Sequence, residues 1–304
     1  MGGDMKSVIV AIILLCFPKS FATEQPIVVI IPSYNNIEWF EWNLTSILTQ
    51  EYHNYRVIYV NDCSSDGTGE AVDNYLSERG IDYHVIDFDN SSQKSIRQST
   101  KNFSQLVNKE PHFFTLINNT FRNGALANLY RGIQSCLDDE IVVTVDGDDW
   151  LYHDHVLTQI NSHYSENEIW LTHGRFIEYP HNHSNWGLNI PPQIVNRGAF
   201  RRFRCPSHLR TFYAWLFKKI KLEDLLYNGQ FFPMTWDMAM MYPMIEMAGE
   251  RHAFIEEVNY VYNMANQIND NKVNPDLQNQ LDRYIRSMPP YKRLTNKEDK
   301  NFKN

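Results

Sequence analysis

Short apolar runs alternate with amphipathic stretches over the first half of the chain. Runs rich in Ile, Val and Phe predict buried strands at 26–31, 55–60, 82–88, 113–117, 141–145 and 169–173. Apolar residues at helical spacing predict helices at 38–50, 68–76 and 126–136, and the polar stretch 91–109 is expected to be a loop with a helical part. Strands that alternate with helices predict the α/β class, with a doubly wound, mostly parallel sheet.

The pattern changes after about residue 180. Residues 180–198 are rich in Pro, Asn, His and Gly, which predicts a long loop. Beyond it we expect helices at 208–220, 237–247 and 276–288, and a strand at 253–262. These elements belong to one domain over residues 23–290, in two halves (23–150 and 151–290), followed by a polar tail at 291–304.

Residues 1–22 form a separate apolar segment. A ten-residue apolar run, Val8 to Phe17, precedes a small-x-small tripeptide at 20–22, the shape of a signal-peptidase site. Ten residues are too few to span a bilayer. We therefore expect a signal peptide or a short membrane-associated leader, and a location in the secretory-pathway lumen or at a membrane. Without a working leader, the chain would be cytoplasmic.

Composition and charge exclude several classes. The 304 residues are 43% hydrophobic and 21% charged, an ordinary globular balance. Lys and Arg number 28 against 36 Asp and Glu, so the net charge of −8 gives no basic footprint for a nucleic-acid partner. Cys16, Cys63, Cys136 and Cys205 are widely spaced, which favours free thiols. One disulfide among the last three remains the alternative.

Polar clusters follow several of the predicted strands. Ser33, Tyr34 and Asn35 follow the first strand, Asn61 and Asp62 the second, and residues 146–149 a later one. In open α/β sheets, ligands bind beyond the carboxyl ends of the strands. The sequence therefore predicts a ligand site at this edge of the sheet.

The DGDD segment at 146–149 places three carboxylates after a buried strand. Like charges this close repel, and hard divalent cations prefer such oxygen ligands. A cation there would neutralise a leaving diphosphate. The alternative is an acidic turn that caps the next helix. The spacing excludes an EF-hand.

Two further segments contain residues that could contact a ligand. Asp62 in VNDCSSDGT (60–68) could accept hydrogen bonds from a base or ribose, and its alternative role is loop and cap chemistry. In RNGALANLYRGI (122–133), Gly124 would let the start of a helix approach a ligand closely.

These segments, in this order and together with PSYN at 32–35, resemble the motifs of the family 2 glycosyltransferases, which have the GT-A fold (Rossmann-like) and transfer sugars with inversion. DGDD resembles the metal-binding D-x-D motif of the family. Asn61 stands where the family's V-D-D-x-S-x-D-x-T segment has its first Asp, which puts the base specificity in doubt. The resemblance covers roughly residues 26–265.

The resemblance implies a nucleoside-diphosphate sugar donor, most often a UDP-sugar, and Mn²⁺ or Mg²⁺ as cofactor. It assigns the first half, 23–150, to the nucleotide sugar and the second half, 151–290, to a glycan, lipid or protein acceptor. The implied nucleotide-binding residues are Pro32, Ser33, Tyr34, Asn35, Asp62, Arg122, Asn123, Gly124 and Asp146. Asp148 would be the main metal ligand, helped by Asp146, and Asp149 would contact the donor or acceptor sugar.

The second half must supply the acceptor site and the catalytic base. PMTWD at 233–237 resembles the family's acidic motif at a helix start, so Asp237 is the expected general base, with a helix N-cap as its alternative. Trp236 would stack on an acceptor ring or pack in the core. His208 would reach the metal or the diphosphate, or be a structural histidine.

Two other functions compete with glycosyl transfer. A sugar nucleotidyltransferase also combines an α/β fold with acidic metal ligands, but it would want a Gly-rich, basic first loop, which PSYN is not. A catalytically dead carbohydrate-binding relative would have lost carboxylates, yet Asp148 and Asp237 are present. Peripheral membrane association is a further expectation, drawn from the leader alone.

Overall fold

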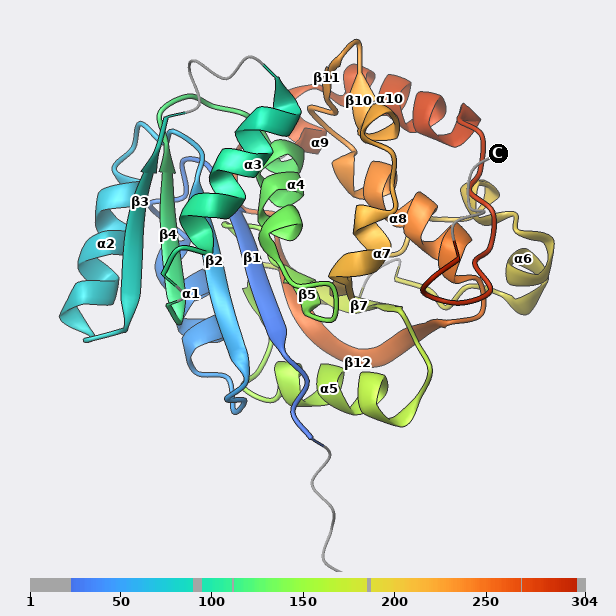
Figure 1. Cartoon of the computed structure of the whole chain (residues 1–304), viewed down its shortest axis with the longest axis horizontal. Coiled ribbons are helices and arrows are strands. Elements are labelled where there is room, and N and C mark those ends of the chain that lie inside the picture. Colours follow the sequence, from blue (N-terminus) through green and yellow to red (C-terminus); the bar gives the residue numbers. More distant parts are fainter. Residues whose placement is uncertain (1–22, 90–94, 111, 185–186, 269, 300–304) are drawn as a thin grey trace, which may run out of the picture.

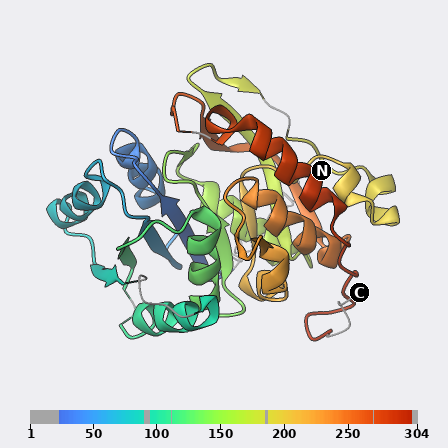
Figure 2. The same ribbon diagram turned by 90° about the horizontal axis from the view of Figure 1, so that it is seen from above.

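The computed structural model describes residues 23–89, 95–110, 112–184, 187–268 and 270–299. The expected leader, residues 1–22, lies outside the described residues. A ten-stranded sheet crosses the molecule, with the N-terminal half at one end of it and the C-terminal half at the other (Figures 1 and 2). Among the described residues, no helix is long and apolar enough to cross a membrane.

The sheet is mostly parallel, as predicted. Its order is β3-β4-β2-β1-β5-β9-β7-β12-β6, and β8 pairs with β7. The bounds are Ile27–Ser33 (β1), Tyr55–Asn61 (β2), Tyr83–Phe88 (β3), Phe114–Asn119 (β4), Ile141–Thr144 (β5), Trp150–Leu151 (β6), Leu171–Tyr179 (β7), His183–Ser184 (β8), Arg210–Tyr213 (β9) and His252–Asn263 (β12). The first five strands of this order run parallel, β9 is antiparallel to both its neighbours, and β12 is parallel to β7 but antiparallel to β6. A separate hairpin pairs β10 (Leu226–Tyr227) with β11 (Gln230–Phe231).

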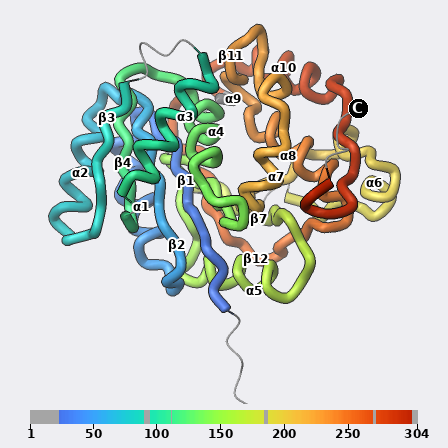
Figure 3. Tube along the Cα trace, in the orientation of Figure 1, coloured from blue at the N-terminus to red at the C-terminus, as the bar shows by residue number. Residues whose placement is uncertain are grey.

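Helices cover both faces of the sheet. Their bounds are Phe40–Leu48 (α1), Thr68–Glu78 (α2), Ile96–Val107 (α3), Ala125–Ser135 (α4), Val156–Glu166 (α5), Pro192–Arg197 (α6), Ala214–Lys218 (α7), Trp236–Ala248 (α8), Asp270–Val273 (α9) and Pro275–Ser287 (α10), with 3₁₀ turns at Phe200–Arg202 and Leu222–Leu225. The trace in Figure 3 follows them in chain order.

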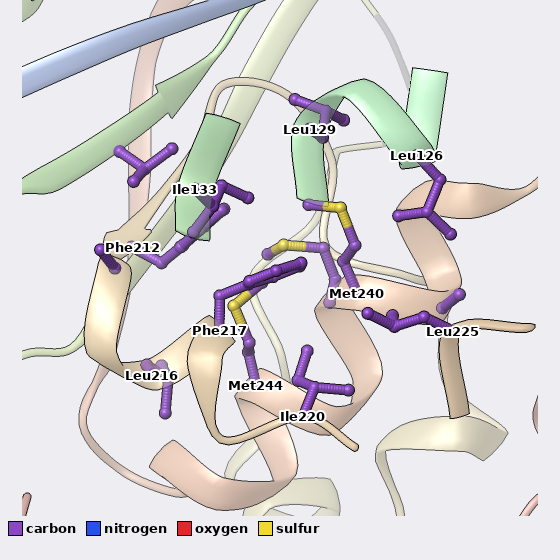
Figure 4. Packing of buried hydrophobic residues seen from close by; sticks show 14 of the residues in the cluster. Leu126, Leu129, Ile133, Phe212, Leu216, Phe217, Ile220, Leu225, Met240 and Met244 are labelled. Atoms are coloured by element: carbon purple, nitrogen blue, oxygen red, sulfur yellow. The ribbon is translucent and has the colours of Figure 1, made fainter. Parts of the chain in front are cut away.

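The side chains of strand β1 show why helices pack against both faces of the sheet. Val28 and Ile30 point into a core with α3, α4, α7, α8 and α10, whereas Ile27, Val29 and Ile31 point into a core with α1, α2 and α5. Alternate side chains of a strand lie on opposite faces, so a continuous apolar run is buried on both sides. Figure 4 shows the first of these cores, where residues of α4 meet residues of α7 and α8.

The structure corrects two expectations about the second half. The helix expected at 208–220 is wrong over its first part, because Arg210–Tyr213 forms β9 and inserts between β5 and β7. Only Ala214–Lys218 is helical there. The expected loop at 180–198 contains the short helix α6, and helix α5 was not predicted. Cys63, Cys136 and Cys205 are free thiols, as expected.

Candidate active site

A cavity of about 420 Å³ lies where the carboxyl ends of β1, β2 and β5 meet the second half of the chain. Most of the predicted site residues line it, namely Pro32, Ser33, Tyr34, Asp62, Arg122, Gly124, Asp146, Asp148, His208, Trp236 and Asp237. Three predicted residues do not line it: Asn35, Asn123 and Asp149. The parallel strands explain the convergence, because their carboxyl ends share one edge of the sheet.

An aromatic ring and a guanidinium form one wall of the cavity. The guanidinium carbon of Arg122 lies 3.7 Å from the centre of the Tyr34 ring. Asn35 supports this wall from behind: its backbone adopts a left-handed conformation with φ of 53°. Its N–H donates to Ser64 Oγ at 2.9 Å, and its side-chain oxygen accepts from the N–H of Ser65 at 2.9 Å. Asn35 therefore holds two loops together rather than facing the cavity.

Asp62 is only 3% exposed, and its carboxylate holds the start of α4. It accepts from the backbone N–H of Gly124 at 2.8 Å, from that of Asn123 at 3.0 Å and from Asn119 Nδ2 at 2.8 Å. A carboxylate at a helix start satisfies N–H groups that have no partner within the helix. The capping role that we kept as an alternative is therefore present in the structure, beside the cavity.

The DGDD turn presents two carboxylates to the cavity. Asp146 and Asp148 both line it, and Asp148 Oδ2 accepts from Asn266 Nδ2 at 2.7 Å. Burial raises the pKa of Asp148 above its usual value. Gly147 is needed between them, because a Cβ there would lie 2.6 Å from the Ser33 side chain. Asn43 Nδ2 on α1 fixes the turn by donating to the carbonyls of Asp146 (3.0 Å) and Asp149 (2.7 Å).

Asp149, expected to contact a sugar, is fully buried and does not line the cavity. Its carboxylate accepts from the hydroxyl of Tyr260 at 2.6 Å and from the N–H of Asn263 at 2.7 Å. Burial, and then the charges of Asp148 and Asp146, raise its pKa well above the usual value. This carboxylate ties the DGDD turn to the end of β12, so a contact with sugar does not fit its position.

His208 lies beside the acidic turn with its ring buried. One ligand atom from each of His208, Asp146 and Asp149 falls within 4.8 Å of the others. The ring stacks on Tyr260 with centroids 4.4 Å apart, and its Nε2 is 3.1 Å from Arg210 Nη2. Burial, and then the charge of Arg210, hold its pKa well below the usual value, so the ring is neutral.

The contact with Arg210 fixes which nitrogen of His208 carries the proton. A guanidinium only donates hydrogen bonds, so Nε2 must accept and the proton lies on Nδ1. Nδ1 is buried and has no hydrogen-bond partner. A cation could bind at Nδ1 only after that proton moved to Nε2 and Arg210 turned away. Asp146 is therefore better placed than His208 to hold a metal, and Asp148 lines the same cavity but does not belong to this cluster.

Asp237 contacts the same nitrogen of Arg210, Nη2, as His208 does. It is the second residue of α8, and Oδ2 accepts from Arg210 Nη2 at 2.9 Å. The N-cap of α8 is Thr235, so the alternative of Asp237 as an N-cap is wrong. Its side chain is 24% exposed and lines the cavity, whereas Arg210 is 4% exposed. Trp236 lines the cavity and also packs against the core, as its alternative role predicts.

Residues at the end of β12 also build the site, although the sequence did not predict them. Tyr262 and Asn266 line the cavity, and Tyr260 and Asn263 hold Asp149. A signal for them existed, because polar residues follow the predicted strand at 253–262 just as they follow the earlier strands. Glu178, at the end of β7, also lines the cavity and was missed.

Comparison with solved structures shows the fold. Residues 1–349 of TarS from S. aureus in complex with UDP align with a TM-score of 0.54 and 13% identity, over 79% of this chain and 61% of that one. The same protein in complex with UDP-GlcNAc aligns with a TM-score of 0.51 and 14% identity, over 79% of this chain and 58% of that one. The chain thus spans less than two thirds of the TarS chains that it matches.

Sequence comparison shows the family. The chain is 33% identical over 78 residues to the putative teichuronic acid biosynthesis glycosyltransferase TuaG of Bacillus subtilis (strain 168), a stretch of 25% of this chain and 30% of TuaG. The profile of glycosyl transferase family 2 matches residues 28–88 and 76–226, which together are more than half of the chain and include the Tyr34 wall, the DGDD turn and His208. The chain therefore belongs to glycosyl transferase family 2 and has the family's GT-A fold.

Proposed function

We propose that this chain is a metal-dependent glycosyltransferase that moves a sugar from a nucleoside-diphosphate sugar to an acceptor hydroxyl with inversion. One observation carries the proposal. A single cavity is lined by a Tyr34–Arg122 wall, by the carboxylates of Asp146 and Asp148, and by the separate carboxylate of Asp237. The reaction needs a flat wall to bind the base, carboxylates to hold a cation beside the diphosphate, and a further carboxylate to remove a proton. The cavity brings these three kinds of group together.

The donor in this proposal is a UDP-sugar. The flat faces of Tyr34 and Arg122 suit a nucleobase, and the charge of Arg122 also suits a diphosphate. The TarS structures contain UDP and UDP-GlcNAc, which supports a uridine nucleotide for a chain of the same fold. Asp62 would act on the nucleotide mainly through α4, since its carboxylate already binds the first N–H groups there.

The residues of the acidic turn fit a divalent cation, Mn²⁺ or Mg²⁺. Asp146 and Asp148 would hold it, with His208 as a further candidate ligand. Burial, and then the charges of Asp148 and Asp146, raise the pKa of Asp149, and a cation would relieve that repulsion. When bound, the cation would supply positive charge for the leaving diphosphate.

Asp237 is the general base of the proposed reaction. In a single displacement, a carboxylate takes the proton of the acceptor hydroxyl while the nucleoside diphosphate leaves from the opposite face of the sugar. Asp237 is exposed to the cavity and held by the buried Arg210 at 2.9 Å, so its orientation is fixed before the acceptor arrives. Trp236 beside it offers a ring for the acceptor to stack on.

The acceptor and the location belong to the proposal as well. A glycan, a lipid or a protein could present the hydroxyl. Secretion or peripheral membrane association rests on the apolar run at residues 8–17 alone. A nucleotidyltransferase is disfavoured by family membership, and a dead relative by the position of Asp148 and Asp237 on the cavity wall.

Thermal unfolding with a panel of nucleotides tests the donor site. A ligand that binds only the native state raises the melting temperature. We expect UDP with Mn²⁺ to raise it more than GDP, CDP or Mn²⁺ alone, and EDTA to remove most of the gain. Equal shifts with all nucleotides, or no shift with UDP, would contradict the proposed donor.

A further inference from the structure

A second groove lies between α1 and the segment that contains β6. Residues of α1 and residues 151–154 form its two walls, and its volume is about 590 Å³. It shares no lining residue with the active-site cavity. Nothing in the proposed reaction uses it, so its side chains need a separate explanation.

Hydrogen bonds between the two walls keep the groove open in a fixed shape. The N–H of Leu151 donates to Ser46 Oγ at 3.0 Å, and Gln50 Nε2 donates to the carbonyl of His153 at 2.6 Å. The N–H of Glu51 also donates to the carbonyl of Asp154 at 2.8 Å. A ligand entering this groove would meet walls that are already in place, which lowers the entropic cost of binding.

Each wall presents a half-exposed aromatic ring. Trp42 on α1 and Tyr152 after β6 are both 52% exposed, which is unusual for rings of this size. The Trp42 ring is held by Trp150, with centroids 5.0 Å apart, and by Tyr179, at 5.8 Å. It therefore offers a fixed apolar face to solvent.

The charges of the groove select the class of ligand. Glu41 and Asp154 line it, together with the hydroxyl residues Thr45 and Thr49, and no Lys or Arg is among the lining residues. The basic side chains near these carboxylates are histidines: His153 lines the groove, and His155 Nε2 lies 3.4 Å from Asp154 Oδ1. Two carboxylates without Lys or Arg beside them disfavour phosphate, sulfate and anionic lipid headgroups. Aromatic faces beside hydroxyl and carboxylate acceptors suit a neutral pyranose, which has apolar C–H faces and hydroxyl edges.

We propose that this groove binds a neutral oligosaccharide. In the proposed reaction, it would hold those sugars of the acceptor that lie far from the reacting hydroxyl. This role, unlike binding itself, rests on the proposed function. Its position supports this role: Trp150 directly follows Asp149, and Tyr179 follows the cavity-lining Glu178. Asn43, next to Trp42 on α1, holds the DGDD turn through two carbonyls. The groove and the active site therefore share their supporting elements.

Calorimetric titration without donor or metal tests the groove directly. The probes are cellohexaose, maltohexaose, hexa-N-acetylchitohexaose and, as an anionic comparison, an alginate hexamer. We expect at least one neutral hexamer to bind, and Trp42→Ala and Tyr152→Ala to weaken it about tenfold each, as for a truncated aromatic anchor. Trp42→Phe keeps a ring and should lose less. Leu137→Ala removes a 73% exposed apolar side chain elsewhere and should change nothing.

The outcomes separate this inference from the proposed reaction. The groove assignment is overturned if no neutral hexamer binds, if the hexamer binds equally well to Trp42→Ala, or if the alginate hexamer binds as tightly as the neutral ones. All variants should keep the wild-type affinity for UDP. Trp42→Ala should lower the melting temperature, because it removes the ring contacts with Trp150 and Tyr179, but the variant should still unfold cooperatively. A chain that binds the hexamer in the groove but no nucleotide would retain the glycan site and refute the donor site.

Discussion

At the scale of single residues, Arg210 connects the acidic turn with the start of α8. One of its terminal nitrogens contacts both His208 beside the acidic turn and Asp237 on α8. A buried guanidinium that satisfies two partners fixes both rotamers, which catalysis by positioned groups requires. Asp237, the proposed base, is thereby positioned in the same hydrogen-bonded framework as His208 beside the acidic turn.

Asp237→Asn should therefore abolish transfer but leave the donor site intact. Loss of a general base typically costs about 10²–10⁴ in rate, and it affects the transition state rather than donor binding. The check is a turnover assay beside UDP titration and thermal unfolding. Turnover near that of the wild type in a stable, UDP-binding variant would disprove the base assignment. Glu250→Gln, on an exposed ion pair, serves as the charge-matched control.

At the scale of elements, the start of α4 depends on a residue of the loop after β2. Asp62 accepts from the N–H groups of Asn123 and Gly124. Because these donors have no partner within the helix, Asp62→Ala should lower the free energy of unfolding by at least about 2 kcal/mol. Hydrogen exchange at these amides should rise in parallel.

The N-cap of another helix, α3, provides a control for this substitution. Ser95→Ala removes the exposed N-cap of α3, which accepts from the N–H of Gln98, and should cost about 1 kcal/mol. If Asp62→Ala is as stable as the wild type but binds UDP far more weakly, then Asp62 acts on the nucleotide and not on α4.

The elements of the first half follow from their local pattern, and so do β12, α8 and α10 of the second half, each within one residue at either end. Strand β9 does not. Strands β1, β2 and β5 are continuous apolar runs, so the sequence predicts both their type and the polar edge beyond them. Strand β9 has only four residues and continues directly into α7, so local pattern alone assigned it to a helix. Its strand state comes from pairing with β5 and β7, which are distant in sequence.

The candidate site likewise has residues that the sequence predicts and side-chain orientations that it does not. Residues after predicted strands, such as Tyr34 and Asp148, were found because strand ends carry ligands in this class of fold. The orientation of each side chain was not predictable, because it depends on partners distant in the sequence. Asp149 turns inward because Tyr260 and the N–H of Asn263 receive it there.

At the scale of the whole molecule, a buried ion pair joins the helices of the second half. Arg201 Nε lies 2.6 Å from Glu246 Oε1 on α8, with side chains that are 9% and 2% exposed. Arg201 Nη1 also donates to the carbonyl of Ile285 on α10 at 2.6 Å. Arg201 therefore connects α8 to α10 in the second half of the chain.

Glu246→Ala should cost roughly 3–5 kcal/mol of unfolding free energy, because it leaves Arg201 charged and buried. Urea denaturation measures the loss. Glu250→Ala breaks the exposed pair with Arg293 and should cost no more than about 1 kcal/mol. Equal effects of the two substitutions would show that Arg201 finds other partners or reaches solvent.

Metal-dependent turnover of a UDP-sugar by the wild type and by Asp148→Asn tests the central claim most directly. UDP release is measured with UDP-glucose, UDP-galactose and UDP-GlcNAc as Mn²⁺ is titrated from an EDTA-treated sample. We predict that one donor is consumed only with the cation. In Asp148→Asn, consumption should fall by about 10² or more at low Mn²⁺, because a charged oxygen ligand is lost. Turnover in EDTA, or a variant as active as the wild type at low Mn²⁺, would contradict the account.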